Sequence, residues 1–306
     1  MLSPANEVVW QFEAIGAPWR IDVTPGPDGQ GARPDDREAV DARIEQFDRD
    51  WSRFRDDSLV TAIARAGGSH RLPGDAGPLL QHFRDLYQVT GGRVSPLVGR
   101  SLEQLGYDAH YRLTPSGDPV AAPAWDSAIA LREDGDRLTL DAPSPVSLDV
   151  GAAGKGYLVD LVAELLMSRG ALGVVVDGSG DLRALGEARI RVGLENPANP
   201  ALVVGTVTLE RGRALAASAP NRRAWGDHGH PCQWQRDRNV GGRRIGARRG
   251  WRGDGVVRRR AVRNRRTTRR RIRTDARRWP PRGEPRLRRR GVRMRATIDR
   301  VTGQVS

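Results

Sequence analysis

Residues 147–160 run Ser-Leu-Asp-Val-Gly-Ala-Ala-Gly-Lys-Gly-Tyr-Leu-Val-Asp, and this stretch decides the fold. Apolar and polar residues alternate over 145–150, which predicts a strand with one buried face. The small residues of 151–156 predict a loop, and apolar residues then recur at helical spacing over 158–166. A short apolar run at 173–177 predicts another buried strand. The predicted order is therefore strand, glycine-rich loop, helix, strand.

Upstream of this stretch the chain alternates predicted strands and helices. Residues 8–23 predict two strands with a turn at Gly16-Ala-Pro18. Steps of four and three between apolar residues from Val40 to Phe54 predict one helical face, and a second amphipathic helix is predicted over 76–90. Further strands are predicted within 127–150. Together these elements predict an α+β fold with a mixed sheet and flanking helices.

The loop 151–156 has the properties of a phosphate site. Small residues let backbone N–H groups approach an anion, and the helix N-terminus adds partial positive charge. Lys155 is the only lysine among 51 basic residues, and its compact ammonium differs from a guanidinium. A tight turn with a solvated lysine explains the same residues, because the loop matches no standard phosphate motif. Asp149 either orients a ligand or metal or caps the helix, whereas Asp177 and Asp181 are typical turn residues.

Length and composition exclude several classes of protein. The 306 residues suffice for one large domain or two ordinary ones. No apolar run approaches the roughly 18 residues of a transmembrane helix, so no membrane span is predicted. A single cysteine, Cys232, excludes an intrachain disulfide framework and a cysteine-based zinc site. The first residues lack the basic and apolar regions of a secretory signal, so we expect a cytoplasmic location.

The charge is divided sharply along the chain. Residues 1–230 carry 24 basic and 32 acidic side chains, whereas residues 231–290 carry 24 arginines and 4 acids. With one Leu and no Phe or Tyr, 231–290 cannot bury enough apolar surface to offset chain entropy, so we predict a disordered basic segment.

Two explanations of the basic segment compete. Its arginines could bind nucleic acid non-specifically, with strong salt dependence. Alternatively, a GC-rich gene is translated out of frame there, since Arg, Gly, Ala, Pro and Trp are the products of GC-rich codons. The 50 arginines against one lysine favour such a gene, and we prefer the frame change.

Several segments together resemble the ApbE family of FAD:protein FMN transferases. The stretch 147–160 is similar to the family's signature loop, and other segments follow the family's order. These are Phe12-Glu-Ala-Ile-Gly16, Trp51-Ser-Arg-Phe-Arg-Asp-Asp-Ser58, Gly91-Gly-Arg-Val-Ser-Pro-Leu-Val98, Val176-Asp-Gly-Ser-Gly-Asp-Leu-Arg-Ala-Leu-Gly186 and Arg213-Ala-Leu-Ala-Ala-Ser-Ala-Pro-Asn-Arg-Arg223. The resemblance implies a T-fold-like ApbE domain over 8–227, followed by the basic segment 228–290 and a remnant of the family's C-terminus at 291–306.

The resemblance implies a chemistry that suits the loop. Such enzymes bind FAD and Mg²⁺, and a threonine hydroxyl of a target flavoprotein attacks the FMN-side phosphorus while AMP leaves. At matching positions Asp149 and Lys155 would contact FAD, and the backbone carbonyl of Ala152 would bind the metal. The site would be lined by Ile15, Phe54, Arg93, Val94 and Ser95. Ordinary core packing is the alternative for Ile15 and Phe54.

The sequence departs from the family at the metal site. Ser95 stands where the family usually has Asp. The family's His-His segment and its later Asp-x-x-x-Thr pair are missing, and the nearest substitutes, His228, His230, Asp237 and Asp254, lack the required neighbours. Oxygen-ligand Mg²⁺ sites usually need carboxylates, so we expect flavin binding with impaired transfer. Two alternatives are an arginine-rich nucleic-acid-binding protein and an FAD pyrophosphatase that uses water as the acceptor.

Overall fold

The computed structural model describes residues 7–196, 199–217 and 296–299. Its strands are β1 (Val8–Ala14), β2 (Ala17–Thr24), β3 (Gly68–Arg71), β4 (Ala130–Asp134), β5 (Arg137–Ala142), β6 (Gly173–Asp177), β7 (Asp181–Gly186), β8 (Arg189–Asn196), β9 (Asn199–Glu210), β10 (Ala214–Ala216) and β11 (Ala296–Asp299). Its helices are α1 (Pro34–Trp51), α2 (Leu59–Ala66), α3 (Ala76–Val89), α4 (Gly99–Gln104), α5 (Trp125–Ala128) and α6 (Gly154–Ser168), with short 3₁₀ turns η1 (Pro27–Gly29) and η2 (Pro96–Val98).

The strands form three sheets. The largest has the order β1-β2-β6-β7-β10, and the others have the orders β11-β8-β9 and β3-β5-β4. The α+β class is confirmed, but every described strand pair is antiparallel, so none of these sheets is mixed in direction. Strand β6 takes a central position because Val174 and Val176 are fully buried and Val175 nearly so.

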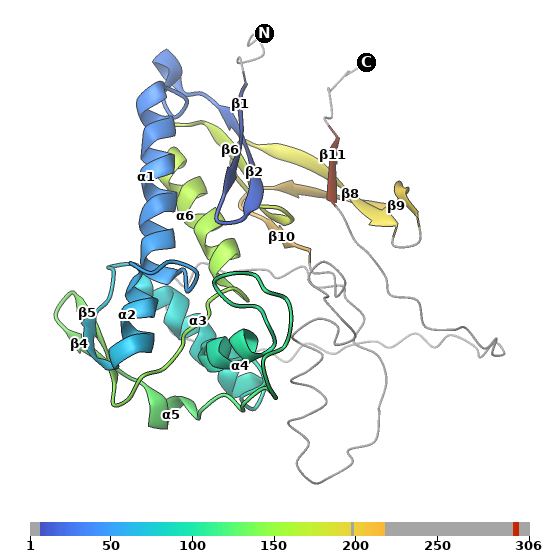
Figure 1. Ribbon diagram of the computed structural model, residues 1–306. Coiled ribbons are helices and arrows are strands. Elements are labelled where there is room, and N and C mark those ends of the chain that lie inside the picture. The colour runs from blue at the N-terminus through green and yellow to red at the C-terminus, as the bar shows by residue number, and fades with distance from the viewer. Residues whose placement is uncertain (1–6, 197–198, 218–295, 300–306) are drawn as a thin grey trace, which may run out of the picture.

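The predicted helix after the glycine-rich loop is confirmed as α6, which covers one face of the five-stranded sheet. It contacts β6 and β7, and α1 packs on its outer side (Figure 1). The layers are therefore α1, α6 and sheet. A second, smaller cluster joins the large sheet to the hairpin β8–β9; it contains Val175, Leu182, Ala184, Ile190, Val192 and Leu209.

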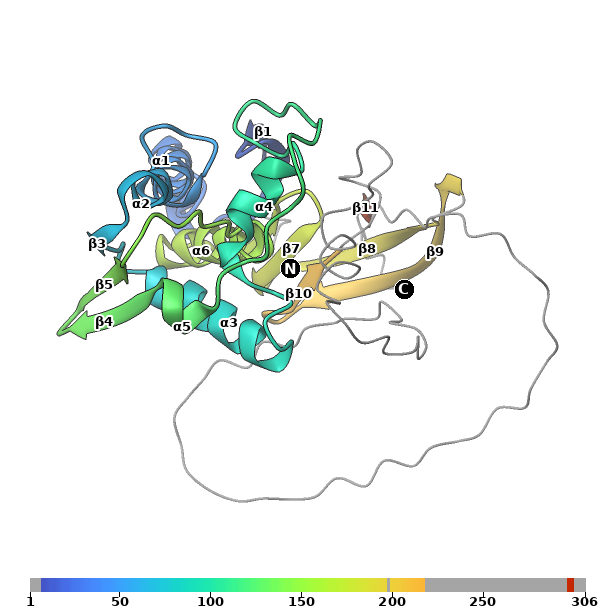
Figure 2. The same ribbon diagram turned by 60° about the horizontal axis from the view of Figure 1, so that its bottom comes forward.

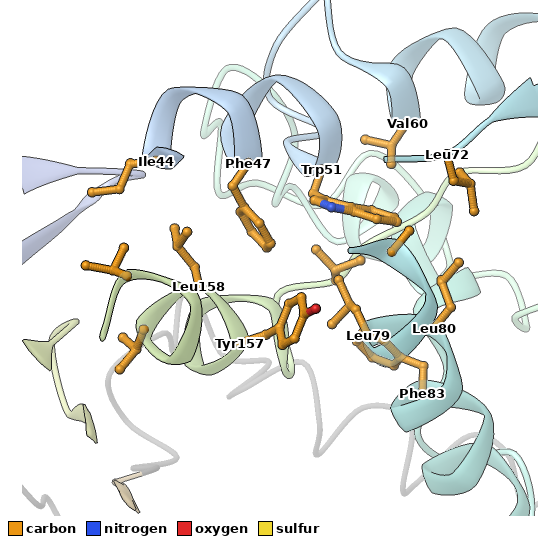
Figure 3. Close-up of a cluster of buried hydrophobic side chains, with 14 of the residues drawn as sticks. Ile44, Phe47, Trp51, Val60, Leu72, Leu79, Leu80, Phe83, Tyr157 and Leu158 are labelled. Carbon is orange, nitrogen blue, oxygen red and sulfur yellow. The ribbon is translucent and has the colours of Figure 1, made fainter. Parts of the chain in front are cut away.

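The main core lies where α1, α2, α3 and α6 meet. Figure 3 shows Phe47 and Trp51 of α1 directed toward Leu158 and Tyr157 of α6 and toward α3. Leu79, Leu80 and Phe83 of α3 are at most 1% exposed. This packing anchors the loop before α6 to the end of α1, which brings together segments about 100 residues apart.

Three predicted elements need correction. The β1–β2 turn lies at Ile15-Gly16, since Ala17 and Pro18 already pair within β2. Phe54 does not belong to the α1 face, because α1 ends at Trp51. Residues 145–150 form no strand, although Leu148 is fully buried as the alternation predicted.

Helix α2 was missed, although Ser58 caps it by accepting a hydrogen bond from the N–H of Thr61 at 3.1 Å. The basic segment 228–290 and most of 291–306 lie outside the described residues. None of the described helices is long and apolar enough to cross a membrane.

Candidate functional site

The glycine-rich loop is held by its own backbone and by Asp149. The N–H of Asp149 donates to the carbonyl of Pro96 at 2.7 Å, and the N–H of Gly151 donates to Oδ1 of Asp149 at 2.8 Å. A Cβ at Gly154 would lie 2.8 Å from Cγ2 of Val150, so close packing requires a glycine there. No side chain caps the N-terminus of α6 at Ala153. The N–H groups of Ala153 and Gly154 already donate to the carbonyl of Val150, so the next N–H groups of the first turn are the ones that suit an anion.

Asp149 forms a buried ion pair with Arg53. Nε of Arg53 lies 2.6 Å from Oδ2 of Asp149, and the two side chains are only 4% and 12% exposed. The pair joins the loop before α6 to the segment between α1 and α2. Breaking a buried pair leaves an uncompensated charge, at a cost of about 3–5 kcal/mol. Asp149 is therefore a fixed carboxylate rather than a solvated one.

An aromatic cluster lies beside this ion pair. The guanidinium carbon of Arg53 lies 4.3 Å from the ring centroid of Phe54 and 4.9 Å from that of Tyr107. Tyr111 stacks on Phe54 with centroids 5.0 Å apart and ring planes 11° apart, and Tyr107 meets Phe54 edge-on at 5.3 Å. Phe54 therefore presents a planar face suited to another flat ring.

Ile15 belongs to the same region and is conformationally unusual. It has φ of 47° and is followed by Gly16 at 69°. Positive φ is a genuine outlier for a β-branched residue. The Oη of Tyr111 lies 3.8 Å from the place of a Cβ on Gly16. In Figures 1 and 2 the loop after α4, which carries Tyr111, lies beside the end of the β1–β2 hairpin.

Residues 93–95, which were predicted to line the site, differ in how far they are exposed to solvent. Arg93 is exposed and Val94 is half-buried. Ser95 is 5% exposed, and its Oγ accepts a hydrogen bond from the N–H of Leu97 at 3.2 Å. Ser95 therefore caps the short turn η2, and the neighbouring Pro96 connects this turn to Asp149.

Lys155 is engaged within the protein. Its Nζ donates to the carbonyls of Gly178 and of Ser179, the latter at 2.9 Å, and lies 3.3 Å from Oδ2 of Asp181. Asp177 accepts from the N–H of Gly180 at 2.8 Å, in keeping with its predicted turn role. The lysine thus ties the start of α6 to the turn between β6 and β7.

The described residues do not form a metal site by themselves. Ala152 is exposed in the turn before α6. Within the described ranges, no group of three or more His, Cys, Asp or Glu side chains is placed to hold a metal ion. His228, His230, Asp237 and Asp254 lie outside these ranges.

Three residues of the region were missed by the sequence analysis. The sequence predicts no role for Arg53, because a contact with a residue 96 positions away has no local signal. Tyr107 and Tyr111 had a signal, since two of the chain's four tyrosines fall within five residues. The structure brings Ile15-Gly16, Phe54, Asp149 and the turn after Ser95 into one contiguous region through these missed residues.

The chain is an α+β protein in which a buried arginine–aspartate pair and stacked aromatic rings lie beside a glycine-rich loop. The model of the ApbE family matches residues 15–234, and the chain belongs to this family. A curated relative, the FAD:protein FMN transferase of Rhodobacter capsulatus, is 29% identical over 230 residues, which are 71% of this chain and 43% of the relative. The chain thus spans less than half the length of this relative.

Solved structures of the family share the fold. The flavin transferase ApbE of Vibrio cholerae has a TM-score of 0.54 at 21% identity, covering 74% of this chain and 76% of that one. The ApbE protein of Thermotoga maritima has a TM-score of 0.57 at 20% identity, covering 73% and 74%. The flavinyl transferase ApbE of Pseudomonas stutzeri has a TM-score of 0.52 at 23% identity, covering 61% and 63%.

Proposed function

We propose that this protein binds FAD and acts as an FAD:protein FMN transferase, with activity impaired in this form of the chain. The observation that carries the proposal is the junction of Asp149 with Arg53 and Phe54, directly before the uncapped N-terminus of α6. Family membership and the name of the Rhodobacter relative support it. A cytoplasmic location stays a prediction from the sequence.

Two features of the region support binding of FAD. A flat ring can stack on Phe54, whose face is now occupied by Tyr111. The backbone N–H groups at the start of α6 suit a pyrophosphate. Ile15, Arg93, Val94, Ser95 and Lys155 stay proposed members of the flavin-nucleotide site. Among them, Lys155 acts on FAD only if its contacts with the Gly178 turn are exchanged for contacts with the ligand.

The proposed reaction moves the FMN group from one oxygen to another. The hydroxyl oxygen of a threonine on the target flavoprotein forms a bond to the FMN-side phosphorus and releases its proton to solvent. The bridging P–O bond breaks, and its electron pair leaves with AMP. The protein contributes by positioning the pyrophosphate and by stabilising its charge.

The proposal takes Mg²⁺ from the family resemblance, with the carbonyl of Ala152 as one proposed ligand. The described side chains do not fit a metal ion, so we derive no step through it. We therefore expect the chain to bind flavin but to transfer FMN slowly or not at all.

The test uses the full chain, FAD and a target flavoprotein that carries the acceptor threonine, with and without Mg²⁺. Covalent flavin fluorescence on the target and release of AMP report transfer. A target with Thr→Val at the acceptor is the matched control. We expect flavin binding and slow or absent labelling; labelling that matches an intact family enzyme would show that the chain is not impaired.

The same assay separates the alternatives. AMP released together with free FMN, in the absence of a target, would indicate an FAD pyrophosphatase. Absence of any flavin binding would contradict the proposal altogether. Salt-sensitive binding to nucleic acid without flavin binding would instead favour the nucleic-acid function predicted from the basic segment.

A further inference from the structure

Two nitrogens of the Arg53 guanidinium make no hydrogen bond to the described residues. Only Nε is paired, with Asp149. Nη1 and Nη2 are both buried and have no hydrogen-bond partner among the described residues. A buried donor without an acceptor costs free energy, and a charged one costs more than a neutral one. The aromatic faces of Phe54 and Tyr107 offset only part of this cost.

One loop supplies part of the covering of this guanidinium. Tyr107 lies over Arg53, and Tyr111, four residues later, stacks on Phe54. Tyr111 and Leu113 have φ of 49° and 52°, a conformation that L-residues seldom adopt. Tyr111 is also 50% exposed. One displacement of residues 107–113 would therefore uncover both the guanidinium and the face of Phe54.

We propose that Arg53 is a further flavin-nucleotide-binding residue, and that residues 107–113 form a cover that leaves when the ligand binds. This rests on the proposed function of the site. With the cover displaced, the flavin ring stacks on Phe54, and Nη1 and Nη2 of Arg53 donate to ligand oxygens. These oxygens are either carbonyls of the ring or oxygens of the phosphate, and a planar guanidinium fork suits both. Nε stays with Asp149, so the charged pair survives binding.

The experiment measures binding of FMN and of riboflavin to the full chain by flavin fluorescence, separately from transfer. Arg53→Lys keeps the charge beside Asp149 but removes the fork. We expect it to weaken FMN binding about tenfold or more, with a melting temperature close to that of the wild type. Arg84→Lys is the matched control, because Arg84 pairs with Asp126 at 2.9 Å and lies 5.7 Å from the ring centroid of Trp125, outside the site.

The comparison with riboflavin, which lacks the phosphate, shows which ligand oxygens accept from Arg53. Equal loss for both ligands assigns Arg53 to the ring carbonyls, and loss confined to FMN assigns it to the phosphate. A second measurement does not depend on a variant that folds. Hydrogen–deuterium exchange of 107–113 in the wild type should rise on adding FMN, and unchanged or slower exchange would overturn the cover.

The outcomes distinguish this inference from the proposed function. If the wild type binds FMN and Arg53→Lys binds it equally well, the inference is wrong and the proposed function stands. If Arg53→Lys alone weakens binding but the wild type releases AMP together with free FMN in the absence of a target, the inference holds and the transferase proposal fails. If the wild type binds no flavin, both are wrong.

Discussion

Ile15 combines a β-branched side chain with φ of 47°, in a turn that touches the aromatic cluster. A left-handed conformation costs such a residue about 1–2 kcal/mol. Asn tolerates this conformation, so Ile15→Asn should leave the free energy of unfolding within about 1 kcal/mol of wild type while weakening FMN binding severalfold. Chemical denaturation and fluorescence titration check the two effects. A loss as large as that of Ile21→Ala, about 2–5 kcal/mol for a fully buried residue, would identify Ile15 as a packing residue instead.

Substitutions of Lys155 can distinguish a structural role of this residue from a ligand-binding role. Its ammonium serves two carbonyls and Asp181, so Lys155→Met should lower the free energy of unfolding by about 1–3 kcal/mol. Thermal and urea unfolding measure this. Lys155→Arg should restore little, because the longer planar group does not fit a space shaped for a compact ammonium. If Lys155→Met unfolds like the wild type yet loses flavin affinity, the lysine serves the ligand.

At the scale of elements, residues 145–150 show what the sequence can predict. The alternation correctly predicted burial of Val146, Leu148 and Val150, because burial depends on which side chains face the core. It wrongly predicted a strand, because the N–H of Asp149 pairs with Pro96 rather than with a neighbouring strand. The periodicity of a sequence shows which side chains share a face, whereas the strand with which a segment pairs depends on residues far away in the chain. The Arg53–Asp149 pair escaped prediction for the same reason.

The stability of the loop that follows α4 should depend on pH through the carboxyl group of Asp108. Burial raises the pKa of this carboxyl, but the hydrogen bond from the Arg112 side chain and those from the N–H groups of Arg112 and His110 outweigh burial and hold the pKa below its usual range. A lowered pKa means that the stabilisation is complete above about pH 4 and is lost as pH falls through the folded-state value.

Acidification from about pH 5 to about pH 2 should therefore lower the melting temperature of the wild type more steeply than that of Asp108→Asn. Circular dichroism melts at a series of pH values measure this. Asp126→Asn serves as the control, because Asp126 is 80% exposed and its slope should follow the wild type. Parallel slopes for Asp108→Asn and wild type would show that the Asp108 contacts do not hold the loop in solution.

At the scale of the whole molecule, the family match and the charge pattern change at nearly the same place. The match ends at residue 234, and the arginine-rich composition begins at about 231. The sequence predicted the α+β class and the layer formed by α6, because these follow from local periodicity. It did not predict three separate antiparallel sheets, since pairing across the fold leaves no local pattern.

The frame-change hypothesis makes a prediction about the protein made in the cell. If the gene is translated in another frame over the basic segment, the native protein should contain no peptide from 231–290, and its intact mass should differ from 33.6 kDa. Strand β11, which pairs with β8, follows that segment, and a return to the family pattern at 291–306 stays a prediction. Peptide mapping with a protease other than trypsin and resequencing of codons 220–300 test this together. Arg-rich peptides at the expected mass would show the segment to be genuine, and the absence of the metal ligands that the resemblance implies would then be a property of the protein itself.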